Sequence, residues 1–260
     1  MHAALWISKT GLSAQDLKLA TISNNLANAG TVGFKRDRAL FQDLVYQVKK
    51  QPGGQASQDT QFPSGLQIGT GVRTVATQKL FNAGTLAVTE QALDMAINGR
   101  GFFQILLPDG SLGYTRDGQF HMDESGQLVT SRGNPLQPAI TIPADAQGVT
   151  IGEDGTVSTR LPSGLLNQVG SIQVTDFLNP GGLQAAGNNI YLETASSGAG
   201  QTGTPGLNGL GAVLQSTLEN SNVNVVEELV NMIATQRTYE MNAKVIQTAD
   251  QMLQQVSQSL

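Results

Sequence analysis

Apolar side chains recur every seven residues along the end of the chain, at Val225, Met232, Tyr239, Ile246, Leu253 and Leu260. Leu229 falls on the same helical face, and neither glycine nor proline occurs after Gly211. Asn224 followed by Glu227 is typical of a helix N-cap with an acidic third residue. The pattern predicts one long helix over residues 221–260, and a heptad stripe of this length needs a partner helix to cover it.

The start of the chain repeats this spacing with leucine, at Leu5, Leu12, Leu19 and Leu26. An amphipathic helix is predicted over residues 3–28, because Ala29-Gly30 supplies a stop signal. Two arrangements are open for the terminal helices. They pair with each other in a coiled-coil-like manner, or both pack onto one globular core. The periodicity favours neither arrangement over the other.

Between the predicted helices the apolar periodicity changes to two, which is typical of β-strands. Alternation begins at Val72, and residues 102–106 form a compact apolar run. Turn dipeptides follow at near-regular spacing: Asp109-Gly110, Asp117-Gly118, Ser125-Gly126, Arg132-Gly133 and Asp154-Gly155. Residues 172–177 and 189–192 predict two more strands. We interpret residues 72–193 as an all-β domain, a sandwich or an irregular barrel, with one short helical turn near residues 90–96.

Segments of different composition join these parts. Residues 34–48 predict a short helix or an extended stretch, and residues 46–71 predict an extended arm. The backbone path of this arm is set by Pro52, Gly53, Gly54, Pro63 and Gly65. Residues 194–211 are a return linker rich in glycine and serine. The expected fold is α+β, with residues 1–45 and 212–260 as a discontinuous helical domain around the inserted arm, β domain and linker.

Composition narrows the classes of function. Charged residues make up 13% of the 260 residues, about half the usual share of about 25%. The net charge is −5 and no basic run occurs, which argues against a nucleic-acid-binding protein. The absence of cysteine excludes disulfides and thiolate metal sites. No apolar run reaches the length of a membrane span, and the N-terminus lacks the basic region of a cleavable signal, so we expect a protein that is not membrane-inserted.

A search for catalytic or metal-binding patterns predicts neither an enzyme nor a cofactor site. The two histidines, His2 and His121, have no second histidine at ligand spacing. The glycine-rich stretch at residues 98–101 lacks the Lys-Ser/Thr of a phosphate-binding loop. Most of the 20 acidic residues fall in turns or at helix ends, where solvated carboxylates are ordinary. We therefore expect no catalytic, cofactor or metal residues.

Both ends of the chain resemble signatures of the bacterial flagellar rod and hook axial proteins. The first match is SNNLAN at residues 23–28, followed by TVGFK at residues 31–35. The second is NVNVVEELVNMI at residues 222–233, followed by QRTYE at residues 236–240. The β domain of the same family is resembled by LDMAINGRGFF at residues 93–103 and YTRDG at residues 114–118. The length, the single β domain and the arm over residues 46–71 are most similar to the distal rod members.

This resemblance implies a structural subunit that polymerises with itself into a rigid hollow helical shaft and transmits motor torque across the periplasm to the hook. It implies that the partners are proximal rod proteins, the hook protein, outer ring bushing proteins and the flagellar type III export apparatus, with export that needs no cleavable signal. The expected location is the rod of the basal body. Two alternatives stay open: another flagellar axial protein of the proximal rod or hook, and a secreted β-domain protein that binds glycan or peptidoglycan.

Within that interpretation, two sets of residues are expected to mediate assembly. The predicted assembly interface comprises Leu5, Leu12, Leu19, Leu26, Asn24, Asn25, Asn28, Phe34, Val225, Leu229, Met232, Tyr239, Ile246 and Leu253. The predicted rigidity arm depends on Pro52, Gly53, Gly54, Pro63 and Gly65. We expect the arm to lie between neighbouring subunits and to restrict their sliding.

Overall fold

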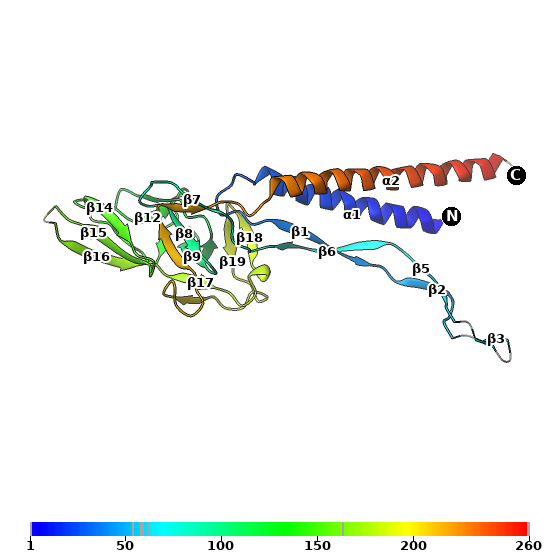
Figure 1. Ribbon diagram of the computed structural model, residues 1–260, viewed down its shortest axis with the longest axis horizontal. Coiled ribbons are helices and arrows are strands. Elements are labelled where there is room, and N and C mark those ends of the chain that lie inside the picture. Colours follow the sequence, from blue (N-terminus) through cyan, green and yellow to red (C-terminus); the bar gives the residue numbers. More distant parts are fainter. Residues whose placement is uncertain (1, 54, 58–59, 62, 163, 259–260) are drawn as a thin grey trace. The chain divides into compact units, whose positions relative to one another are not determined.

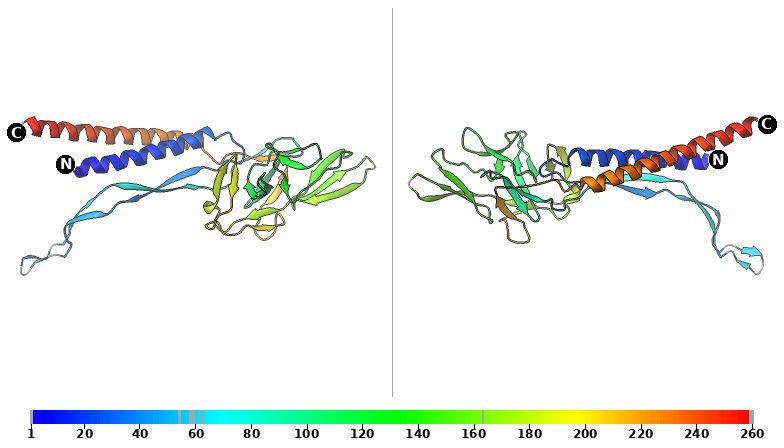
Figure 2. Two further views of the ribbon diagram at one scale, coloured as in Figure 1. Left: turned by 180° about the vertical axis from the view of Figure 1, so that it is seen from behind. Right: turned by 45° about the horizontal axis from the view of Figure 1, so that its top comes forward.

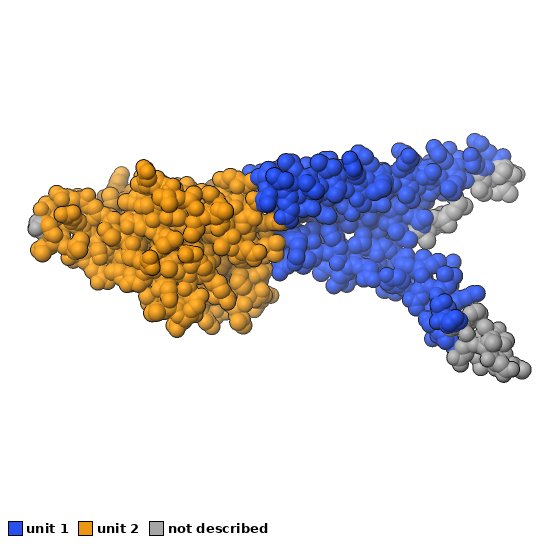
Figure 3. All heavy atoms as spheres, viewed as in Figure 1, with its two compact units in different colours: residues 1–27, 37–78, 224–260 blue, residues 28–36, 79–223 orange. Residues whose placement is uncertain are grey.

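The computed structural model describes residues 2–53, 55–57, 60–61, 63–162 and 164–258. It divides the chain into two compact units, which are coloured separately in Figure 3. Unit 1 consists of residues 1–27, 37–78 and 224–260, and unit 2 consists of residues 28–36 and 79–223. Residues 37–78 thus belong with the helices, whereas the segment just after the first helix belongs with the β region. The fold is α+β, as predicted.

Unit 1 contains both helices, α1 (His2–Ala27) and α2 (Val225–Gln258). The first closely matches the prediction, and the second begins four positions later than expected. Its cap is the predicted one, because the Asn224 Oδ1 accepts hydrogen bonds from the backbone N–H of Val226 and Glu227 at 3.1 and 3.3 Å. The helices lie side by side (Figures 1 and 2). Their contact is close at Gly11, where an added Cβ would lie 3.2 Å from the Asn242 amide nitrogen.

The rest of unit 1 is a run of paired antiparallel strands, which we call the ribbon (residues 37–78). It contains β1 (Asp37–Asp43) with β6 (Val72–Lys79, whose last residue falls in unit 2), β2 (Tyr46–Lys50) with β5 (Leu66–Gly69), and β3 (Gln55–Ser57) with β4 (Thr60–Gln61). Asn25 ties the ribbon to the end of α1. Its amide nitrogen donates to the carbonyl of Asp37, and its Oδ1 accepts from the Asp37 N–H, both at 2.9 Å. Of the two possibilities for residues 34–48, the structure has the extended one.

Unit 2 is built from antiparallel strands. Its largest sheet has the order β18 (Gln184–Gly187), β19 (Ile190–Leu192), β10 (Leu112–Thr115), β9 (Phe102–Leu106), β17 (Val174–Asp176) and β20 (Gln201–Gly203), with β13 (Leu136–Gln137) also paired to β9. A second sheet joins β14 (Gly148–Ile151), β15 (Thr156–Arg160) and β16 (Leu166–Ser171). The remaining pairs are β8 (Met95–Asn98) with β21 (Ala212–Gln215), β7 (Leu86–Val88) with β22 (Thr217–Glu219), and β11 (Phe120–Met122) with β12 (Leu128–Thr130). One short 3₁₀ helix, η1, covers Pro180–Gly182.

The core of unit 2 contains one segment that was predicted correctly and lies beside two that were not. Met95, Phe103 and Ile105 are fully buried in its main apolar cluster, as the run at residues 102–106 indicated. Of the helical turn predicted near residues 90–96, only a hydrogen-bonded turn at residues 92–93 is present, because β8 starts at Met95 and pairs with β21. Asp117-Gly118 is not a hairpin turn. Gly118 instead lets the chain approach the Met95 carbonyl so closely that a Cβ would overlap it.

Candidate assembly surfaces and a buried ion cluster

The predicted interface residues on the helices are only partly covered. Leu5, Leu12, Leu19 and Leu26 are half-buried, as are Met232, Ile246 and Leu253. Val225, Leu229 and Tyr239 stay more than 40% exposed. The fully buried positions are mostly small or polar, namely Ser8, Ala14, Ile22 and Asn25 on α1 and Glu228 and Thr235 on α2. Small residues let the helices approach closely, so the larger apolar side chains lie toward the edges of the contact.

A second apolar face runs along α2 and was not singled out in the sequence. It consists of Val226, Val230, Ile233, Met241, Val245 and Met252, each between 47% and 70% exposed. We call these residues the outer face of α2. At 100° per residue Val226, Val230 and Ile233 point away from the buried Glu228 and Thr235, and the three later residues follow on the adjoining side of the helix. The three- and four-residue spacings between several of these apolar positions indicate this face in the sequence. The heptad stripe lies on the opposite side of the helix, and only that side was predicted to be an interface.

The ribbon also exposes apolar side chains. Val45 is 82% exposed, and Tyr46 and Val48 are about half exposed. Among the predicted arm residues, Pro52 and Gly53 form a turn, and Gly65 lies so close that an added Cβ would be 2.6 Å from the Pro52 ring. Pro63 lies in a bend before β5, and Gly54 falls outside the described residues. An isolated two-stranded ribbon with little cover is marginal in water, so its apolar side chains favour a partner.

The asparagines and the phenylalanine predicted near the N-terminus occupy different environments. Asn24 is exposed, whereas Asn25 is 1% exposed and holds the ribbon. Asn28 is half-buried in unit 2, where its Oδ1 accepts a hydrogen bond from Thr31 at 3.2 Å. Phe34 is buried in unit 2 beneath the Lys79 ammonium, which lies 5.2 Å from the ring centroid. Within the single chain, Phe34 is thus a core residue.

Unit 2 also contains a buried ion cluster of Lys35, Arg116 and Glu219, whose side chains are 0, 4 and 1% exposed. The Lys35 ammonium donates to Glu219 Oε1 at 2.6 Å, and the Arg116 guanidinium donates to Oε2 at 3.1 Å. Lys35 also donates to the Asn82 carbonyl, and the Gly84 N–H donates to Glu219. Both carboxylate oxygens are therefore occupied, as a buried charge requires.

Backbone contacts fix the same cluster in place. Arg116 donates to the carbonyls of Ile97 and Gly99 at 3.3 and 2.7 Å, and the Glu219 carbonyl accepts from the Gly33 N–H at 2.8 Å. Gly33 has a φ of +68°, and a Cβ there would lie 2.7 Å from the Arg116 carbonyl. Sequence analysis missed this cluster because its members lie far apart along the chain. The only available hint was a lysine and an arginine inside apolar-rich motifs.

Burial and charge act in opposite directions on the ionisation of this cluster. Burial alone would raise the pKa of Glu219, but the nearby Arg116 and Lys35 charges outweigh it and hold the pKa below its ordinary value. Burial lowers the pKa of Lys35, although the attraction of Glu219 opposes the shift. The carboxylate is therefore ionised at neutral pH.

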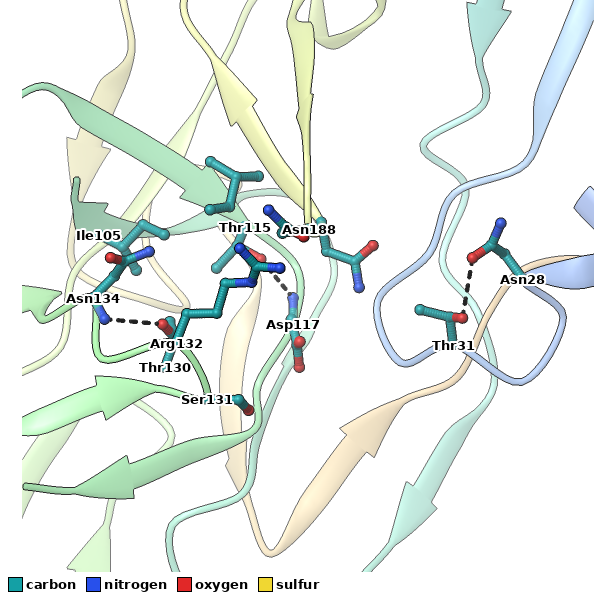
Figure 4. Close-up of a pocket in the computed structure, with 12 residues that line it drawn as sticks. Asn28, Thr31, Ile105, Thr115, Asp117, Thr130, Ser131, Arg132, Asn134 and Asn188 are labelled. Carbon is teal, nitrogen blue, oxygen red and sulfur yellow. Dashed lines mark hydrogen bonds between the residues drawn. The ribbon is translucent and has the colours of Figure 1, made fainter. Parts of the chain in front are cut away.

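A polar pocket of about 390 Å³ opens on unit 2 (Figure 4). Its lining is rich in amides and hydroxyls and comprises Asn28, Thr31, Ile105, Thr115, Asp117, Thr130, Ser131, Arg132, Asn134, Asn188, Asn189 and Ile190. Burial raises the pKa of the Asp117 carboxyl, while the hydrogen bond from the Gln119 N–H opposes this shift. None of the described residues that line the pocket is aromatic.

Neither a metal-binding cluster nor a membrane-spanning helix occurs among the described residues. Within these residues no group of three or more histidine, cysteine or acidic side chains is arranged to hold a metal ion. No helix among them is long and apolar enough to cross a membrane.

Three family models match along the chain. The flagella basal body rod protein model matches residues 5–35, the flagellar hook protein FlgE/F/G D1 domain model matches residues 96–159, and the flagellar basal body rod FlgEFG C-terminal model matches residues 214–259. Lys35, Arg116 and Glu219 fall one in each matched segment. The ion cluster is therefore a point where all three segments meet.

Curated relatives match nearly the whole chain. The flagellar basal-body rod protein FlgG of Buchnera aphidicola subsp. Schizaphis graminum is 53% identical over 99% of this chain and all of its own. The FlgG proteins of Caulobacter vibrioides and Bacillus subtilis are 48% and 38% identical, each over 98% of both chains. Among solved structures, the Helicobacter pylori hook protein FlgE2 matches with a TM-score of 0.25 at 14% identity, covering 71% of this chain and 43% of that one, which is too little to support an argument. Because relatives well above 30% identity align from end to end, this chain belongs to the family of bacterial flagellar basal-body rod proteins that includes FlgG.

Proposed function

We propose that this chain is a structural, non-enzymatic subunit of the distal rod of the bacterial flagellum. End-to-end similarity to FlgG proteins supports the assignment. The observation that carries it is the outer face of α2, an apolar stripe on a helix whose opposite side already contacts α1. A stripe of this kind on a single chain favours burial against further copies.

In this proposal the two helices pair in a coiled-coil-like manner and form the inner wall of a hollow helical tube. The half-buried leucines of α1 and the half-buried apolar residues of α2 supply the pairing within a subunit. The outer face of α2 supplies contacts to neighbouring subunits. Repetition of one heterologous contact generates an open helical polymer, which suits a drive shaft that transmits torque to the hook.

In this proposal the arm over residues 46–71 makes the polymer rigid. Its strands expose Val45, Tyr46 and Val48, which would be covered by a neighbouring subunit. The turn at Pro52 and Gly53 and the close approach of Gly65 would keep its path fixed. Deleting residues 46–71 should give filaments that are softer or curved. Straight filaments of unchanged stiffness would mean that the arm has another role.

The polymer would lie in the basal body, with its rod spanning the periplasm. Its partners would be proximal rod proteins on one side, the hook protein on the other, and outer ring bushing proteins around it. The subunit would be delivered through the flagellar type III export apparatus. Family membership supports these assignments.

Electron microscopy of the purified chain tests the function. We expect straight rods at high protein concentration. Val230→Asp should abolish them, because it places a charge on the outer face of α2, whereas Gln247→Asp, on an exposed polar position of the same helix, should assemble normally. Since Val230 is 60% exposed, the monomer of the variant should keep the thermal unfolding of the parent chain. Rods formed equally well by Val230→Asp would refute the role of this face.

Helix order before assembly can be tested separately. Because both terminal helices expose apolar side chains, we expect them to be protease-sensitive in the monomer and protected in the polymer. Limited proteolysis combined with far-UV circular dichroism measures this. Termini that resist protease in the monomer at micromolar concentration would contradict assembly-coupled ordering.

A further inference from the structure

A groove of about 320 Å³ lies between the two helices of unit 1. Its walls are Gln15, Asp16 and Leu19 from α1 and Thr235, Gln236, Tyr239 and Glu240 from α2. The groove lies away from the outer face of α2, because it opens along the contact between the helices. It is therefore a separate feature of the molecule.

The groove has the chemistry of a receptor for a long cationic side chain. Two of its residues, Asp16 and Glu240, are acidic, and none is basic. Within the described residues, neither carboxylate has an ion pair or a hydrogen bond. The Oε1 atom of Gln15 is buried and accepts no hydrogen bond from any described residue, so it leaves an acceptor unused. Leu19 and Tyr239 add apolar walls, against which a methylene stem could pack while its charged end reaches the carboxylates.

The chain itself carries a segment that complements this groove. Residues 44–58 contain Lys49 and Lys50 and no acidic residue. All of β2 is exposed, and its lysines follow the exposed Tyr46 and Val48. Figures 1 and 2 both show the β2–β5 pair diverging from the helices within unit 1, and no residue of β2 lines the groove of its own chain. A neighbouring copy can supply the strand instead.

We propose that the groove between α1 and α2 receives strand β2 of a second copy, with Lys49 or Lys50 entering between Asp16 and Glu240. The inference rests on the proposed self-assembly and specifies where the ribbon of one subunit docks on the next. Opposite charges give such a contact its specificity, since a shifted register would leave the Asp16 and Glu240 carboxylates without a cation.

Engineered cysteines test the contact directly, because the chain has no cysteine of its own. Chains with Lys49→Cys or Lys50→Cys are mixed with chains carrying Glu240→Cys, assembled and oxidised. We expect a disulfide-linked heterodimer from at least one mixture in the polymer and none in the monomer. Glu124→Cys, at an exposed turn of unit 2, is the matched control and should not cross-link. The proposal would be overturned if a Lys49→Cys/Glu240→Cys chain formed an intramolecular disulfide. It would also be overturned if the polymers cross-linked no better than the control.

Charge exchange provides the second measurement. Asp16→Lys/Glu240→Lys and Lys49→Glu/Lys50→Glu should each raise the critical concentration for polymerisation about tenfold or more, because attraction becomes repulsion. Combining all four changes should restore it, whereas Glu124→Lys/Arg160→Glu should leave it unchanged. The docking site would be refuted if the fourfold variant did not assemble like the parent chain, or if neither double variant raised the critical concentration. Either result would leave the rod function intact. A parent chain that forms no polymer at all would instead refute the proposed function, and this inference with it.

Discussion

Replacing Glu219 by alanine should strongly destabilise unit 2. The substitution removes the carboxylate that pairs with both Lys35 and Arg116, whose side chains are at most 4% exposed. It also leaves the Gly84 N–H without its acceptor. Neither cation can reach water without breaking the surrounding backbone contacts.

The magnitude follows from the number of charges left without a partner. Breaking one buried ion pair costs about 3–5 kcal/mol, chiefly because the remaining charge stays buried. Here one substitution leaves two such cations, so we expect a loss of at least about 3–5 kcal/mol in the free energy of unfolding. A domain of ordinary stability has about 5–15 kcal/mol in total. Glu219→Ala should therefore remove a large share of the free energy of unfolding of unit 2.

Urea unfolding followed by circular dichroism, together with hydrogen exchange of residues 95–106, measures this loss within unit 2. With a slope of about 2 kcal/mol per molar urea, the midpoint should fall by about 1.5–2.5 M. Glu124→Ala, which removes an exposed carboxylate of the same unit, is the control and should leave the midpoint within about 0.3 M. Glu219→Gln/Lys35→Met should recover part of the loss, because one uncompensated charge disappears with its partner. A midpoint for Glu219→Ala within 0.5 M of the parent, about 1 kcal/mol, would refute the reasoning.

Three further outcomes are expected. The pKa of Glu219 is lowered in the folded state, so its stabilising contribution is complete above the unfolded pKa and is lost as pH falls through the folded one; urea midpoints measured from pH 6 to pH 2 should fall more steeply for the parent than for Glu219→Ala. Asn25→Ala should cost unit 1 about 1–3 kcal/mol in a thermal melt of the assembled rods, since both Asp37 backbone groups lose their partner, whereas Ser13→Ala, at an exposed position of α1, should have little effect. Gly118→Ala should destabilise unit 2 by about 1–3 kcal/mol or more through overlap with the Met95 carbonyl, while Gly148→Ala, which has open space around it, should not.

The helices and most strands could be predicted from the sequence because their signals are local. Asn224 capped α2 as expected, and the apolar run at residues 102–106 became β9. The helical turn predicted near residues 90–96 is limited to a turn at residues 92–93, because tertiary pairing decides the rest of that segment. Met95 starts a strand that pairs with residues more than 100 positions later. No pattern within a short window contains that information.

The candidate site could be predicted only in part, because a sequence pattern does not show which residues meet in the folded chain. A heptad stripe identifies residues that repeat along a helix, but it cannot tell which side meets the partner helix and which side stays exposed. Phe34 illustrates the difficulty, because it lies inside a recognisable motif and is nevertheless buried within its own unit. The ion cluster was beyond reach, since Lys35 and Glu219 are 184 positions apart and only the fold brings them together.

The two units differ in how far their apolar and charged side chains are buried. We therefore expect substitutions in one unit to change unfolding and substitutions in the other to change assembly. Unit 2 buries its large apolar residues around Phe103 and Ile105 and joins its internal charges in one buried cluster, in which Lys35 and Arg116 share the Glu219 carboxylate. Unit 1 leaves Val230 and Met241 exposed on α2 and an unused acceptor at Gln15. Because burial that is already complete within one chain can gain little from a neighbour, changes inside unit 2 should alter unfolding before they alter assembly. Changes on the exposed faces of unit 1 should alter polymerisation while the folded monomer keeps its stability, since those side chains acquire their partners only in the polymer.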